Sequence, residues 1–156
     1  KLLQTPIAGI EELRDGEAPA DGTLPPACEI LVNRGAGPDA ETQDFDFNLY
    51  TKADGTGGLR LHYDAASKTC TIDRTCLNKR FNMAVGEVLD MPLENPLRSL
   101  GVFVDRSSTE YFVNDGEAVF TTHSYPETEE FHYTVTDGAG VKIYRLAPSV
   151  KDDFVI

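Results

Sequence analysis

The length, composition and charge of this chain exclude several classes of protein. With 156 residues it is long enough for one buried core and too short for a second domain of typical size. Fourteen basic and 26 acidic residues give a formal net charge of −12, which would repel phosphate backbones and anionic lipid. No apolar run approaches the roughly 20 residues that cross a bilayer. We therefore expect neither nucleic acid nor a membrane as a partner.

The three cysteines, Cys28, Cys70 and Cys76, favour a reducing compartment. Their number is odd, whereas a secreted disulfide scaffold normally has an even set. If Cys70 and Cys76 lie on one extended strand, about 20 Å separates them, which is too far for a disulfide. We predict three reduced thiols and a cytoplasmic protein, with secretion as the alternative. The sequence begins at Lys1 without an initiator Met, and its first residues show no signal-peptide pattern. We therefore expect it to come from a longer polypeptide or a processed product.

The N-terminal part of the chain contains the helix that the sequence predicts. Ile7–Arg14 should form two turns at most, because Pro6 suits a helix start and Asp15-Gly16 suits its end. Ile10 and Leu13 lie on one face of this helix with Ile7 and Arg14. Residues 15–26 are rich in Gly, Pro, Asp and Ala without periodicity and are predicted to form a loop.

From Ala27 onward the hydrophobic pattern repeats every second residue, as Phe45, Phe47 and Leu49 illustrate by sharing one strand face. About nine or ten short strands at spacings of roughly ten residues favour an antiparallel sandwich over βαβ units. We therefore predict an all-β fold: an antiparallel two-sheet β-sandwich with one short N-terminal linker helix. A loop is expected over 33–43, and residues 78–99 fit short strands or an edge-covering loop equally well. The predicted strands are 28–33, 44–50, 59–64, 69–73, 102–105, 109–113, 119–120, 131–135 and 141–146.

The stretch Leu100–Phe120 is the longest run with a regular pattern, and it predicts a three-stranded antiparallel meander in the middle of a sheet. One turn is the polar trio Arg106–Ser108, and the other is Asn114–Gly116, whose residues tolerate positive φ. Phe103 and Phe112 point away from the valines and the tyrosine beside them, so both faces of these strands are apolar. Such strands are covered on both sides, so we predict an interface. Its candidate residues are Phe103, Phe112, Ile10 and Leu13.

Asp105 and Glu110 flank the first turn and could form a pair of glycosidase carboxylates. Arg106 lies between them, and its positive charge would keep a carboxylate ionised instead of raising its pKa for acid catalysis. We therefore predict that Asp105, Arg106 and Glu110 staple the hairpin and that none of them is catalytic.

Other potential sites lack the spacing that their chemistry needs. His62, His123 and His132 lie on three predicted strands without a metal-ligand motif, and Gly55–Gly58 lacks the Lys and the helix of a phosphate loop. The acidic residues Asp44, Asp46 and Asp54 are not spaced as in an EF-hand loop, so a calcium site is the less favoured interpretation. We predict no metal and no cofactor.

The segment Val102–Pro126 closely resembles the signature of the C-terminal β-sandwich domain of glycoside hydrolase family 32, which comprises invertases, sucrose-6-phosphate hydrolases, levanases and inulinases. Leu2–Pro6 and Ile10–Arg14 resemble the family's exit from its catalytic propeller and its linker helix. The resemblance covers nearly the whole chain and implies a jelly-roll sandwich of the concanavalin A-like lectin type. Further similar segments occur in family order at Asp44–Phe47, Leu61–Asp64 and Ile72–Thr75.

The catalytic motifs of that family are absent from this sequence. The family's nucleophile lies in a Trp-Met-Asn-Asp-Pro-Asn motif, and this chain has no Trp. The Arg-Asp-Pro and Glu-Cys motifs are missing too, because Arg14-Asp15 precedes Gly16 and Cys28-Glu29 has the reverse order. The resemblance therefore implies that the chain is not itself an enzyme, with no catalytic residue to transfer, and that its parent is a retaining hydrolase of β-fructosides.

The implied organisation divides the chain at residue 26. Residues 1–26 would be the end of the catalytic propeller and a linker with a short helix, and residues 27–156 would be the sandwich domain. The expected partner is the chain's own five-bladed propeller domain, which the sandwich would stabilise, and a contribution to a homodimer is left open. A lectin-like module that binds fructans is the alternative, but the lack of Trp favours weak or no carbohydrate binding.

Overall fold

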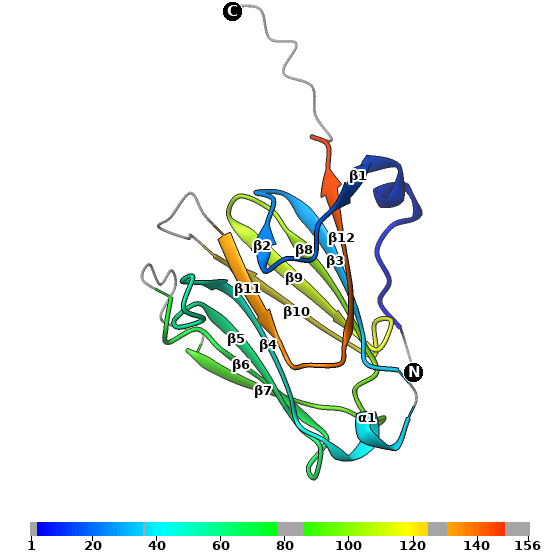
Figure 1. Cartoon of the computed structure of the whole chain (residues 1–156). Helices are drawn as coiled ribbons and strands as arrows, with labels where there is room; N and C mark the ends of the chain where they lie inside the picture. Colours follow the sequence, from blue (N-terminus) through cyan, green and yellow to red (C-terminus); the bar gives the residue numbers. More distant parts are fainter. Residues whose placement is uncertain (1–2, 36, 78–85, 125–130, 149–156) are drawn as a thin grey trace, which may run out of the picture.

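The computed structural model describes residues 3–35, 37–77, 86–124 and 131–148, which fold into two six-stranded antiparallel sheets packed as a sandwich (Figure 1). Sheet A contains, in spatial order, β1 (Arg14–Ala18), β12 (Gly140–Leu146), β3 (Cys28–Asn33), β8 (Ser99–Val104), β9 (Ser108–Val113) and β10 (Ala118–His123). Sheet B contains β2 (Thr23–Leu24), β11 (Phe131–Val135), β4 (Phe45–Thr51), β5 (Leu59–Asp64), β6 (Thr69–Asp73) and β7 (Val88–Pro92). The predicted all-β sandwich is confirmed.

The alternation of apolar and polar residues fixes which face of each strand is buried. In β4 the side chains of Phe45, Phe47 and Leu49 are buried, while Asp46 between them is exposed. The same pattern in β5 places Leu61 directly opposite Phe47 in the ladder. A slip of one residue would move every apolar side chain to the wet face, so the pattern also fixes the register.

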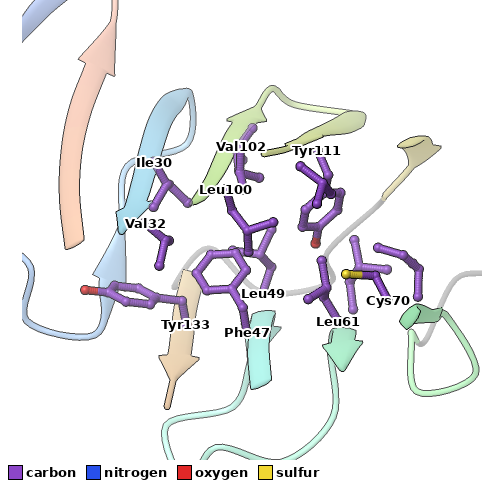
Figure 2. Packing of buried hydrophobic residues seen from close by; sticks show 14 of the residues in the cluster. Ile30, Val32, Phe47, Leu49, Leu61, Cys70, Leu100, Val102, Tyr111 and Tyr133 are labelled. Carbon is purple, nitrogen blue, oxygen red and sulfur yellow. The ribbon is translucent and has the colours of Figure 1, made fainter. Parts of the chain in front are cut away.

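The core lies between the two sheets, and Figure 2 shows side chains from both of them meeting there. Sheet A contributes Ile30, Val32, Leu100, Val102 and Tyr111, and sheet B contributes Phe47, Leu49, Leu61, Cys70 and Tyr133. Several of these, including Leu61 and Tyr111, have no exposed surface at all. Close packing of this kind makes the core sensitive to the loss of even a few methyl groups.

The meander is confirmed as three consecutive antiparallel strands, β8, β9 and β10, but its expected place in the middle of a sheet is wrong. β10 pairs only with β9 among the described strands and forms one edge of sheet A. β3 and β12 join the sheet on the β8 side instead. The hairpin pattern predicts pairing within the meander, whereas it contains no information on which distant strands are added.

Two predicted loops contain regular structure. The segment 15–26 includes most of β1 and all of β2, and the segment 33–43 includes the short helix α1 (Pro38–Thr42). β1 and β2 form because they pair with β12 and β11 near the other end of the chain. The division of the chain at residue 26 stays a prediction, although both strands before it lie in the sheets.

The predicted N-terminal helix is a 3-10 helix over Ala8–Leu13, without a side-chain cap at Ile7. In the ambiguous segment 78–99, β7 supports the short-strand interpretation, while residues 78–85 lie outside the described part of the chain. No helix among the described residues is long and apolar enough to cross a membrane.

Replacing Leu61 by alanine should lower the free energy of unfolding by about 2 to 5 kcal/mol, because it leaves a cavity in a fully buried site. The matched control is Leu89→Ala on β7, where the side chain is 43% exposed and the loss should stay below about 1 kcal/mol. Urea unfolding followed by circular dichroism measures both. Equal losses for the two variants would contradict the core described above.

Candidate functional site

The outer face of sheet A, which points away from sheet B, holds Phe103 and Phe112, two of the four residues predicted for an interface. Phe103 on β8 and Phe112 on β9 pack edge to face there, with their ring centroids 5.7 Å apart at an interplanar angle of 89°. Phe103 lies opposite Glu110 in the ladder, and Phe112 lies opposite Gly101. Phe103 is 9% exposed and Phe112 is partly exposed.

Further apolar side chains extend this face across the sheet. The register places Leu31 opposite Gly101, and Val119 opposite Phe112. Tyr144 on β12 lies opposite Glu29 on β3, which itself lies opposite Phe103. We call this set the outer apolar face: Leu31, Phe103, Phe112, Val119 and Tyr144. Its members other than Phe103 are half-buried.

A partly buried ion pair lies beside Tyr144 on the same face. The Arg14 guanidinium donates from Nε and Nη2 to the two carboxylate oxygens of Glu29, at 2.6 and 2.9 Å. Glu29 is only 4% exposed, and the Arg14 guanidinium carbon lies 4.5 Å from the centroid of the Tyr144 ring. The hydrogen bond that Arg14 donates to Glu29 is the main cause of a raised Arg14 pKa, so this cation stays charged. Such a bidentate pair fixes geometry as well as charge.

The N-terminal segment, residues 3–13, attaches to sheet A at two points. Gln4 donates its backbone N–H to the Gly116 carbonyl at 3.2 Å, and Ala147 donates its N–H to the Leu13 carbonyl at 2.8 Å. In Figure 1 this dark blue segment passes from beside the yellow β9–β10 turn up to β1. Ile10 and Leu13, both predicted for the interface, are half-buried in its 3-10 helix, so they are not bare surface residues.

The turn after β9 is organised by the Glu117 carboxylate. It accepts hydrogen bonds from the backbone N–H groups of Glu94 and Asn95 and from the side-chain amides of Asn95 and Asn114. Desolvation acts to raise the pKa of Glu117, but these hydrogen bonds outweigh it and lower the pKa to about 2. The predicted positive φ of the turn is confirmed, with values of 48°, 56° and 95° at Asn114, Asp115 and Gly116.

Of the three residues predicted to staple the first hairpin, Asp105 and Arg106 lie in its turn and Glu110 lies within β9. Asp105 and Arg106 are exposed, and Asp105 Oδ1 accepts a hydrogen bond from the Arg106 backbone N–H at 2.7 Å. The Asp105 N–H donates to the Ser108 carbonyl, which closes the turn through the main chain. Glu110 lies on β9 on the outer face of sheet A. An ionic staple formed by Arg106 with the two carboxylates stays a prediction.

The other residues weighed as chemical sites have local partners. Asp44 accepts a hydrogen bond from the Ala65 N–H, Asp46 pairs with His62 Nδ1 at 2.9 Å, and Asp54 caps the turn at Thr56. No group of three or more His, Cys, Asp or Glu side chains within the described ranges could hold a metal ion. The three histidines lie on separate strands, as predicted.

A ring of three hydroxyl groups joins the two sheets at the start of β9. Tyr50 on β4 contacts Thr109 at 2.7 Å, Thr109 contacts Ser124 at 2.9 Å, and Ser124 donates to Tyr50 at 3.1 Å. Thr109 and Ser124 are fully buried. With each hydroxyl donating once and accepting once, the ring satisfies its own hydrogen bonds, so its role is structural.

The match to known proteins identifies the family. Residues 17–148 match the family described as "Glycosyl hydrolases family 32 C terminal". The chain belongs to this family. The resemblance inferred from Val102–Pro126 is thereby confirmed, and the outer apolar face is a surface of a family 32 C-terminal domain.

The curated relatives of this family 32 domain are much longer chains. Sucrose-6-phosphate hydrolase of Escherichia coli is 27% identical over 147 residues, which are 92% of this chain and 30% of the relative. Sucrose-6-phosphate hydrolase of Streptococcus mutans is 29% identical over 139 residues, or 88% of this chain and 28% of the relative. The chain therefore spans less than a third of the length of these relatives.

Solved structures with the same fold agree with this assignment. Sucrose-6-phosphate hydrolase from Lactobacillus gasseri superposes with a TM-score of 0.74 at 21% identity, over 93% of this chain and 31% of that one. Exo-inulinase from Aspergillus awamori gives a TM-score of 0.62 at 24% identity, over 86% and 28% of the two chains. At these identities the superpositions establish the sandwich fold.

Three features of this surface are not predicted by the sequence. The pattern places Arg14 on one helix face with Ile7, Ile10 and Leu13, but it does not indicate that Glu29 is its partner. The Asn114–Gly116 turn was recognised, but nothing in the pattern indicated that Gln4 would bind it. Ile7 shares its predicted helix face with Ile10 and Leu13, yet it is 78% exposed while they are half-buried.

Replacing Glu117 by glutamine should make the stability less sensitive to acid. Because the pKa is lowered to about 2 in the folded state, the carboxylate stabilises the fold above the unfolded-state pKa near 4.3, and this contribution is lost as the pH falls towards 2. Solvent screening limits the effect to about 1 kcal/mol. Urea unfolding at pH 7 and pH 3 should show a smaller drop for Glu117→Gln than for the wild type.

The matched control for this pH experiment is Glu12→Gln, which removes an exposed carboxylate of the 3-10 helix. Its drop between pH 7 and pH 3 should equal that of the wild type. The same drop for all three proteins would show that the hydrogen bonds to Glu117 do not favour its charged form.

The thiols should differ in reactivity in the native protein. Burial raises the pKa of Cys28 and of Cys70 to about 12, whereas Cys76 is partly exposed; all three are free. Since the thiolate is the reactive species, an aromatic disulfide reagent at pH 8 should label one thiol quickly. Unfolding in guanidinium should then release three. Fast labelling of Cys28 or Cys70 in the folded chain, located by mass spectrometry, would contradict their burial.

Proposed function

We propose that this chain is the non-catalytic C-terminal module of a β-fructofuranosidase and that it packs the outer apolar face on the catalytic domain of the same polypeptide. Its role is to stabilise that domain. The parent is proposed to be a retaining glycoside hydrolase that acts on β-fructosides such as sucrose or sucrose 6-phosphate.

The observation that supports this proposal most directly is the edge-to-face pair of Phe103 and Phe112 outside the core. An antiparallel sheet with one face in the core usually presents a polar second face to water. Sheet A instead carries five apolar side chains there, four of them half-buried, and apolar patches outside the core can mark interaction sites. This chain spans less than a third of its relatives. The remaining two thirds of such a polypeptide are long enough to contain the proposed catalytic domain.

The sequence supports the non-catalytic part of the proposal, because it contains none of the three catalytic motifs of the family. The three free cysteines support a cytoplasmic location, since thiols stay reduced there. An assay of this chain alone should therefore show no cleavage of sucrose or of sucrose 6-phosphate.

The test is to mix this chain with the separately produced catalytic domain of its parent and to measure association by analytical ultracentrifugation. A one-to-one complex is expected. Phe112→Ser should raise the Kd about 30-fold, because it removes a central aromatic side chain of the interface worth about 2 kcal/mol.

Val88→Ser is the matched control for Phe112→Ser. Val88 is 51% exposed on β7 of the other sheet, so its loss should leave the Kd unchanged. The proposal would be wrong if the wild-type chain did not bind the catalytic domain, or if both variants weakened binding equally. Circular dichroism of each variant checks that the fold is retained.

A further inference from the structure

The N-terminal segment, residues 3–13, is attached to sheet A at both of its ends. One attachment is the hydrogen bond from the Gln4 N–H to the Gly116 carbonyl. The other combines the Ala147 to Leu13 hydrogen bond with the bidentate Arg14–Glu29 pair directly after the segment. The eight residues between Gln4 and Leu13 are therefore tied to sheet A at both ends.

Gly116 permits an unusually close approach of this segment. It is buried with a φ of 95°, and a Cβ at this position would collide with the carbonyl oxygen of Gln4. That Cβ would also lie 2.7 Å from the Gln4 carbonyl carbon and 3.0 Å from its nitrogen. The obstacle is main chain, which no side-chain rotation can relieve. Only glycine therefore allows the two backbones to touch here.

The turn that holds Gln4 is itself rigid. Asn114 Oδ1 accepts a hydrogen bond from the Arg98 N–H at 2.8 Å, and its amide donates to the Pro96 carbonyl and to Glu117. Glu117 in turn holds the backbone of Glu94 and Asn95. Movement of Gly116 would have to break this network, so the turn is a firm anchor.

The segment presents two of its large apolar side chains, Leu3 and Ile7, to the outside. Ile7 is 78% exposed and Leu3 is 56% exposed. The carboxylates of Glu11 and Glu12, one turn further along, are exposed too. An apolar side chain held in place on a rigid backbone loses little entropy on binding, which favours its use as a contact.

We propose that residues 3–13 are a preformed part of the docking surface, and that Ile7 and Leu3 insert into an apolar pocket of the upstream catalytic domain that is rimmed by basic side chains. Gly116 and Arg14 act as positioning residues that hold the segment for this purpose. The inference rests on the proposed function, since it names a second contact to the same partner. The exposed carboxylate of Glu12 near Ile7 is the reason for a basic rim, since Glu11 already pairs with Arg14.

The clamp can be tested in this chain alone by hydrogen exchange followed by NMR. Gly116→Ala should accelerate exchange of the Gln4 amide at least about tenfold, because the close approach becomes impossible. The matched control is Gly138→Ala, where φ is 87° and a Cβ would meet nothing within 4 Å. Both variants have the strain of a positive φ, but only the first should release Gln4. Unchanged exchange in Gly116→Ala would overturn the clamp.

The contact is tested by the affinity for the separately produced catalytic domain. Ile7→Ser should raise the Kd about tenfold and Gly116→Ala by a similar factor, while Val88→Ser and Gly138→Ala should leave it unchanged. If Phe112→Ser weakens binding but Ile7→Ser does not, the further inference is wrong and the proposed function stands. If the wild-type chain does not bind at all, both are overturned.

Discussion

Burial of apolar side chains on both faces of β8 and β9 is the constraint on which the rest of the structure depends. Val102 and Tyr111 fill the core between the sheets, while Phe103 and Phe112 pack against each other outside it. Val102 and Tyr111 contact the core that sheet B also lines, whereas Phe103 and Phe112 form a second apolar surface outside it. Exposure of this second surface to water is unfavourable. One pair of strands thus organises both the domain's own core and its proposed contact with a larger enzyme.

Two glutamates beside this surface are stabilised in different ways. Glu29 is almost fully buried and is compensated by the bidentate guanidinium of Arg14, so removal of Arg14 would leave an unpaired buried carboxylate. Glu117 is compensated by hydrogen-bond donors of the main chain and of two asparagines. Each one secures an attachment of the N-terminal segment, which links the electrostatics of the domain to the geometry of its linker.

The two ends of β9 have contrasting roles. At its start, the hydroxyl ring of Tyr50, Thr109 and Ser124 ties sheet A to sheet B in the interior. At its end, Gly116 ties sheet A to the N-terminal segment on the exterior. The signature segment that identified the family therefore includes residues that hold the sandwich together and residues that receive the chain leading into it.

The sequence by itself determined the all-β class, most of the strands and the family, because period-two burial and turn chemistry are local properties. It also placed Phe103 and Phe112 on an outer face, which follows from alternation alone. Only the tertiary structure decided that β10 is an edge strand, that β1 and β2 exist, and that Arg14 meets Glu29 and Gln4 meets Gly116. These pairings join residues from 15 to more than 100 positions apart, and no local pattern encodes which distant partner a strand or a charge will find.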